Sequence, residues 1–131
     1  MQRAAGWPVA VALITVAATV TVASVDPNEA GHYPTCPSLY FSGFWCPGCG
    51  SLRAVHDLAH GDLVGALGMN ILTVVAVPYL LWRWATWFAR SLGYAIPRRL
   101  APGWVIWTLL AVIVVFTVAR NVPLFGPYLA P

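Results

Sequence analysis

Three long apolar stretches, over residues 7–25, 63–84 and 103–119, alternate with polar segments along the chain. The first, from Trp7 to Val25, carries no charged residue, and each stretch is near the length of about 20 residues that a helix needs to cross a bilayer. Val and Thr are frequent in them, but in lipid the backbone must satisfy its own hydrogen bonds, which imposes a helix. The pattern predicts an all-α membrane protein with three transmembrane helices.

The polar segments divide this single membrane domain, residues 1–131, into a connection over 26–62, a loop over 85–102 and a tail over 120–131. Within the connection, Pro47 suits the start of a helix and Gly61 its end, so we expect a short interfacial or re-entrant helix over about 47–60. Its apolar stripe would consist of Leu52, Val55 and Ala59. Asp62 can cap the second span, and Pro78 can kink it.

Composition places this pattern in lipid rather than in water. Hydrophobic residues make up 60% of the chain and charged residues only 8%, whereas soluble domains have about 45–50% and about 25%. A chain of this size could not hide so much apolar surface from water. The lipid bilayer is therefore the expected partner, and nucleic acid is not, because the arginines form no basic stripe.

The placement of arginine predicts the orientation. The N-terminus and the second loop lie on one side and hold Arg3, Arg83, Arg90, Arg98 and Arg99. The other side holds Arg53, Arg120 and all four acidic residues. The positive-inside rule then puts the N-terminus in the cytoplasm and the connection outside the cell membrane. A cleaved signal peptide over residues 1–25 is the alternative for the first stretch.

All three cysteines lie in the connection, and Cys46 and Cys49 form a Cys-Pro-Gly-Cys unit. In a structural interpretation, one pair forms a disulfide that staples the segment, which an oxidising exterior permits. In a redox interpretation, Cys46 is the N-cap of the short helix, where amides and the helix dipole favour a nucleophilic thiolate, and Cys49 resolves the mixed disulfide. Cys36 would then be a third, shuttling thiol.

A metal interpretation is also open, because Cys-Pro-x-Cys-Gly is the turn of a zinc knuckle. Cys36 could supply the third ligand, and His56 or His60 the fourth, since residues four or seven apart share a helix face. A single C-x-x-C unit is half of what a firm zinc assignment needs. Both histidines otherwise suit a wet interfacial helix face.

Three further polar residues attract attention. Arg53 and Asp57 are four residues apart and can pair on one helix face, or Arg53 can offer its fork to an anionic headgroup or a partner carboxylate. Asn70 lies about 12 Å beyond Asp62 along the second span. A polar side chain at that depth usually faces a neighbouring helix.

The motifs Cys46-Pro47-Gly48-Cys49-Gly50, Arg53-Ala54, Gly61-Asp62-Leu63 and Asn70 resemble the bacterial membrane family called domain of unknown function 2752. Its pattern is C-P-x-C-G-x-T-R-A, a short helix, G-D-L, and an Asn in the next span. The stretch from Asp26 to Pro37 resembles actinobacterial members, and the resemblance extends to about residue 80. The chain departs from the pattern at Leu52, where Thr is usual, and at Ile71, where Pro is common.

The family has no established activity, so the resemblance implies the topology and the site but no reaction. We expect an accessory or scaffold membrane protein with a structural Cys-rich site, formed by a disulfide or a metal. It would work with an unidentified membrane or envelope protein, or as a homo-oligomer. A thiol–disulfide oxidoreductase using Cys46 and Cys49 is the alternative, and an oligomeric small-solute transporter component is a second one. An enzyme is the less favoured class.

Overall fold

The computed structural model describes residues 3–29, 31–98 and 101–130, and every regular element in these ranges is a helix. The helices are α1 (Arg3–Ser24), α2 (Pro37–Ser42), α3 (Ser51–Ala59), α4 (Leu63–Ser91), α5 (Gly103–Asn121) and α6 (Gly126–Leu129). Three of them, over Ala5–Ser24, Leu63–Ser91 and Gly103–Asn121, are long and apolar enough to cross a membrane. The predicted all-helical class with three candidate spans is confirmed.

The outer surfaces of the three long helices are apolar along their length. On α5, for example, Trp104, Ile106, Trp107 and Val115 are all more than half exposed. Monomeric soluble proteins rarely show contiguous apolar surface of this extent. The helices therefore present to lipid the side chains that a soluble bundle would bury.

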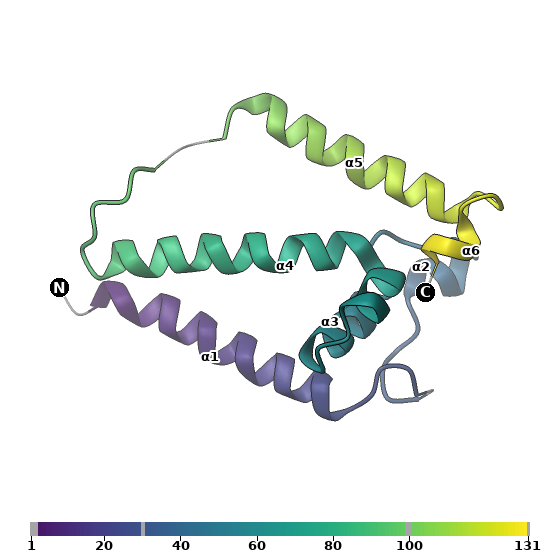
Figure 1. The fold of residues 1–131 in the computed structure, drawn as a ribbon, viewed down its shortest axis with the longest axis horizontal. Coiled ribbons are helices and arrows are strands. Elements are labelled where there is room, and N and C mark those ends of the chain that lie inside the picture. Colours follow the sequence, from purple (N-terminus) through teal and green to yellow (C-terminus); the bar gives the residue numbers. More distant parts are fainter. Residues whose placement is uncertain (1–2, 30, 99–100, 131) are drawn as a thin grey trace.

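The helices α1 and α4 run side by side, and α3 lies between them near the end of α1 that leads into the connection (Figure 1). Trp84 donates from Nε1 to the carbonyl oxygen of Pro8 at 3.0 Å, which ties α1 to α4 near the opposite end. The third long helix, α5, diverges from α4 toward its own N-terminus and approaches the rest of the protein at its C-terminal end (Figure 1). The connection, the start of α4 and the end of α5 thus meet at one end of the molecule.

The helix α4 is interrupted at Asn70, whose φ of −162° and ψ of 99° are not helical. Its first part packs with α3, and its second part runs from residue 71 to 91. At 1.5 Å per residue the second part is about 31 Å long, close to the thickness of a hydrocarbon core. The sequence pointed to Pro78 for a kink, but the non-helical residue within α4 is Asn70.

The short helix after the cysteines begins later than expected. It starts at Ser51, after Gly50 with a φ of 80°, whereas the sequence suggested a start near Pro47. Residues 47–50 form a turn instead, so Cys46 does not cap a helix. The fully buried residue of α3 is Ala54, which does not belong to the predicted apolar stripe. The expected end is found, because Gly61 adopts a φ of 81° that only glycine adopts readily.

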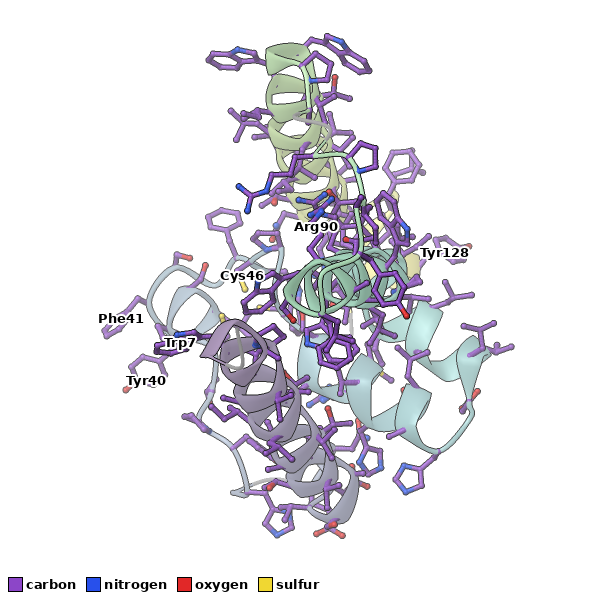
Figure 2. All side chains as sticks on the ribbon, turned by 90° about the vertical axis from the view of Figure 1, so that its left-hand side faces the viewer. Trp7, Tyr40, Phe41, Cys46, Arg90 and Tyr128 are labelled. Carbon is purple, nitrogen blue, oxygen red and sulfur yellow. The ribbon has the colours of Figure 1, made fainter. Side chains whose placement is uncertain are left out.

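Aromatic side chains mark the end of the molecule that carries the connection. Tyr40 and Phe41 project outward from α2, and Tyr128 projects outward from α6 on another side (Figure 2). All three are at least three-quarters exposed. Such side chains are typical of the interface between lipid and water, which is consistent with an interfacial position of α2 and of the tail.

Candidate functional site

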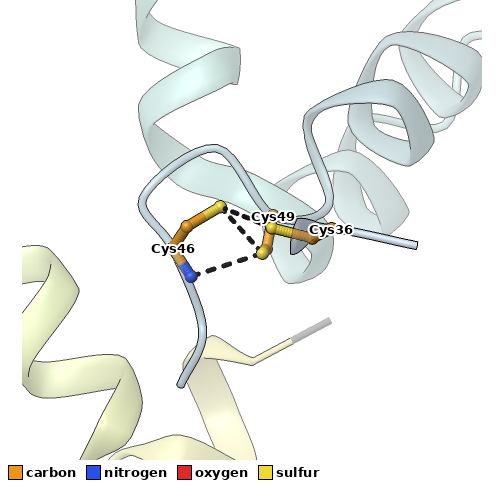
Figure 3. A group of neighbouring side chains, drawn as sticks. All are labelled: Cys36, Cys46 and Cys49. Atoms are coloured by element: carbon orange, nitrogen blue, oxygen red, sulfur yellow. Dashed lines mark hydrogen bonds between the residues drawn. The ribbon is translucent and has the colours of Figure 1, made fainter. Parts of the chain in front are cut away.

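The three cysteines come together although Cys36 is ten residues before Cys46 in the sequence (Figure 3). The Sγ atom of Cys46 lies 3.3 Å from that of Cys36 and 2.8 Å from that of Cys49. All three sulfur atoms fall within 4.8 Å of one another, and all three residues are free thiols. We call this group the thiol cluster.

Local backbone structure builds the cluster from two turns. Cys36 precedes α2, and the chain reverses at Gly43, which has a φ of 72°. The Ser38 hydroxyl donates to the carbonyl oxygen of Phe44 at 3.1 Å and holds this reversal. The Cys49 amide then donates to the carbonyl oxygen of Cys46 at 3.2 Å, which closes the Cys-Pro-Gly-Cys turn. The cluster lies where the two turns meet.

The three thiols differ in acidity. The Leu39 amide in the first turn of α2, followed by the thiols of Cys49 and Cys46, lowers the pKa of Cys36 from 9.0 to about 7. Burial is the main reason that the pKa of Cys49 rises to about 12.

Asn70 holds the cysteine turn against α4. Its side chain is 1% exposed, and its Nδ2 donates to the carbonyl oxygens of Pro47 and Cys49 at 2.9 and 3.0 Å. Its Oδ1 accepts from the Thr73 amide at 3.2 Å. The side chain therefore satisfies groups of an irregular turn and of the interrupted helix together. The sequence analysis expected Asn70 to face a neighbouring helix, whereas in the structure its amide contacts the cysteine turn.

Ser51 extends this network. Its hydroxyl accepts from Asn70 Nδ2 at 3.3 Å and from the Thr73 hydroxyl at 2.9 Å. The family pattern places a threonine at the position of Leu52, which is 45% exposed in this protein. The hydroxyl in the network thus comes from the preceding residue.

Two residues of α5 complete the site, and the sequence analysis did not select either of them. Arg120 donates from Nη1 to the carbonyl oxygens of Cys46 and Cys49 at 3.1 and 3.0 Å. Asn121 accepts from the Trp45 amide at 2.8 Å and donates to the Trp45 carbonyl oxygen at 2.9 Å. The end of α5 is thereby bonded to the backbone of the cysteine turn.

The Arg120 guanidinium is almost fully enclosed. Its residue is 1% exposed, its Nε has no hydrogen-bond partner, and its Cζ lies 4.9 Å above the ring centre of Phe116. In the sequence, the one signal for Arg120 is its position at the end of the third apolar stretch, on the side of the membrane that was predicted to hold few arginines. Ionisable residues in such segments usually mark functional sites.

The structure does not bring the two predicted histidine ligands to the cysteines. His56 contacts the Val22 carbonyl oxygen through Nδ1 at 2.8 Å and lies 3.9 Å from an Asp26 carboxylate oxygen. His60 contacts the His56 carbonyl oxygen at 2.8 Å. Among the described residues, the group whose ligand atoms lie close enough to hold a metal ion consists of the three cysteines.

The remaining predicted residues organise the surroundings of α3. Arg53 donates to the Pro27 carbonyl oxygen at 3.4 Å, and within the described residues it forms no ion pair with Asp57. Asp62 accepts from the Gly65 amide at 2.8 Å and caps α4 as expected. These residues fix the loop and the start of α4 but do not reach the thiol cluster.

Residues 36–84 match the model of a family described as Protein of unknown function (DUF2752). The match begins at Cys36 and therefore includes the thiol cluster, α3 and Asn70, but neither the stretch before Cys36 nor α5. It confirms the resemblance to this family and concerns the family as a whole rather than any branch of it. No curated protein and no solved structure matches the chain.

Proposed function

We propose that the chain is a small multi-pass membrane protein whose Cys-rich segment is a structural joint, that is, the backbone surface to which the end of its third span is bonded. The observation that carries the proposal is the attachment of α5 through Arg120 and Asn121 to the backbone of residues 45–49. Among the described residues, the backbone of α5 does not come close to that of α1, α3 or α4. The joint would suit an accessory or scaffold protein, which needs a fixed shape rather than a reaction.

Thermal unfolding of the full chain in detergent micelles tests this role. We expect Asn121→Ala and Arg120→Met to lower the free energy of unfolding by about 1–3 kcal/mol each, because buried backbone groups lose their partners. Thr108→Ala is the matched control, because Thr108 is exposed on the same helix and bonds only to the Trp104 carbonyl oxygen of its own helix. Unchanged unfolding of both site variants would contradict the joint.

We further propose that the thiol cluster lies outside the cytoplasm, as the arginine distribution suggests. Cysteines added at two exposed positions, Asn28 in the connection and Leu92 after α4, provide a test when mass spectrometry of the peptides separates their labelling from that of Cys36, Cys46 and Cys49. An impermeant maleimide applied to intact cells should label Asn28→Cys and not Leu92→Cys. The opposite labelling would reverse the topology.

Thiol–disulfide exchange is a second candidate function, favoured by the distances of 2.8 and 3.3 Å from the Cys46 sulfur to its two neighbours. A thiolate of the cluster would attack a disulfide of a partner protein, forming a mixed disulfide and releasing one partner thiol. A second cluster thiolate would then release the other partner thiol and leave a disulfide in the cluster. The two electrons pass to the partner. Mixed disulfides trapped with Cys46→Ser or Cys49→Ser, but not with the parent, would support this function.

A further inference from the structure

The buried cation of Arg120 lies beside the thiol cluster and has no balancing anion in an ion pair of the described residues. Arg120 contacts the carbonyl oxygens of Cys46 and Cys49, and the ion pairs in the described residues, His32–Glu29 and His56–Asp26, involve neither Arg120 nor another arginine. An enclosed cation without a balancing anion is costly. The thiols are the acidic groups nearest in structure to the turn that Arg120 contacts.

Two chemical states of the thiol cluster differ in the net charge that they place beside Arg120. A disulfide uses two of the cysteines, leaves the third as a thiol and is electrically neutral, so the charge of Arg120 stays unbalanced. Three thiolates with one divalent cation carry a net charge of minus one, which the guanidinium neutralises. The second state also engages all three sulfur atoms that the fold has gathered within 4.8 Å.

We propose that Cys36, Cys46 and Cys49 bind one divalent thiophilic ion of the zinc class as three thiolates, with Arg120 balancing the remaining charge. Metal–sulfur bonds of about 2.3 Å hold sulfur atoms about 3.8 Å apart in a tetrahedral site. The Cys36–Cys46 and Cys46–Cys49 separations of 3.3 and 2.8 Å are shorter, so shifts of about 1 Å in sulfur position complete the geometry. A fourth position remains for water or an added small ligand, as in zinc sites with three protein ligands.

This inference rests on the proposed structural joint. It assigns the bound ion as the link that holds the two cysteine-bearing segments together. Binding draws the segment before α2 and the Cys-Pro-Gly-Cys turn onto one ion, and displaces the thiol protons. The turn in turn offers its carbonyl oxygens to Arg120 and Asn70. The ion would therefore fix the backbone surface on which α5 docks.

The primary experiment uses the unmodified full chain, purified in detergent without chelator. Elemental analysis should find one zinc per chain, and a mercurial reagent that modifies thiols should release it. Replacement by Co²⁺ should produce a sulfur-to-cobalt charge-transfer band in the near ultraviolet. A reduced protein that takes up neither Zn²⁺ nor Co²⁺ would overturn the proposal without any variant having to fold.

Variants then assign the ligands and the counter-charge. Each of Cys36→Ser, Cys46→Ser and Cys49→Ser should weaken Zn²⁺ binding and weaken the cobalt band. Arg120→Met should weaken Zn²⁺ binding roughly 10- to 100-fold, the range seen for outer partners of metal ligands, and Arg120→Lys, which keeps the charge, should recover part of it. His60→Gln is the control and should bind one ion with unchanged affinity. Loss of binding in His60→Gln would overturn the three-thiolate ligand set.

The two proposals fail separately. If the segment is a structural joint but binds no metal, the Cys variants should unfold more easily than the parent, and the parent should contain no ion. A metal site without a structural role would appear as one bound ion per parent chain whose removal leaves the unfolding midpoint unchanged.

Discussion

Asn70 and Arg120 meet at a single atom, the carbonyl oxygen of Cys49, which accepts one hydrogen bond from each at 3.0 Å. One donor comes from the interruption of α4 and the other from the end of α5. Both lone pairs of a carbonyl oxygen in an irregular turn are thus used. Buried polar groups of an irregular backbone segment need hydrogen-bond partners, and these two side chains supply them for the Cys49 carbonyl oxygen.

We expect Asn70→Ala to lower the free energy of unfolding by about 1–3 kcal/mol, because it leaves buried acceptors without a donor. Asn70→Asp should be at least as harmful, since a carboxylate cannot donate to the carbonyl oxygens of Pro47 and Cys49. Unfolding by denaturing detergent would measure both, with the exposed Asn28→Ala as the control. Equal stability of Asn70→Asp and the parent would show that the donor function is unimportant.

A second prediction concerns Gly65 at the start of α4. A Cβ atom there would lie 2.9 Å from Cγ of Asp62, so the carboxylate would have to turn away and give up the cap. We expect Gly65→Ala to cost about 0.5–2 kcal/mol, the value of an N-cap. In an Asp62→Ala background the loss should disappear and Gly65→Ala should stabilise slightly, as expected for a helical Gly→Ala change without a clash, which a double-mutant cycle of unfolding free energies would reveal.

Gly68→Ala is the matched control for that cycle, because a Cβ at Gly68 meets nothing within 4 Å. In a helix this change should stabilise slightly, by about 0.5–1 kcal/mol. Additive effects of Gly65→Ala and Asp62→Ala would contradict the steric argument.

The acidities of the thiols predict an order of alkylation in the reduced, metal-free protein. Because the Leu39 amide and the other two thiols lower the pKa of Cys36 to about 7, its modification by iodoacetamide should reach half of its maximal rate near pH 7 and rise above it. Burial raises the pKa of Cys49 to about 12, so that thiol should stay protonated and slow across the same range. Peptide mapping by mass spectrometry at several pH values would follow each cysteine, and faster modification of Cys49 would refute the order.

The link between α1 and α4 gives a fourth prediction. Trp84→Phe removes the hydrogen bond to the Pro8 carbonyl oxygen but keeps the aromatic packing on Phe88. We expect a loss of about 0.5–1.5 kcal/mol in unfolding free energy. Trp104→Phe, on the exposed side of α5, should change stability by less than about 0.5 kcal/mol. Similar losses in both variants would indicate a general effect of tryptophan removal.

The sequence was sufficient for features that depend on local rules. The lengths of the apolar stretches predicted the long helices. Gly61 predicted the end of α3 and Asp62 predicted the cap of α4, because a helix end depends on residues within one turn of it. The start of α3 was placed too early because Pro47 suits both a helix and a turn, and the positive φ of Gly50 decides between them.

Features that depend on distant contacts were not accessible from the sequence. The interruption of α4 at Asn70 is stabilised by bonds to residues about twenty positions earlier. Arg120 and Asn121 contact residues more than seventy positions earlier. The spacing of His56 and His60 suggested ligands, but nearby carbonyl oxygens and Asp26 occupy them. No periodicity within one helix encodes such contacts.

The divergence of α5 from α4 toward the loop that joins them has a consequence for the behaviour of the protein in membranes of different thickness (Figure 1). Two spans are tied near both ends, by α3 and by Trp84, whereas the third is held at one end. A helix adjusts to a thicker or thinner bilayer by changing its tilt, and a helix fixed at one end can do so without disturbing its neighbours. We therefore expect the tilt of α5, measured by oriented solid-state NMR, to follow the acyl-chain length of the lipid while the angle between α1 and α4 stays constant.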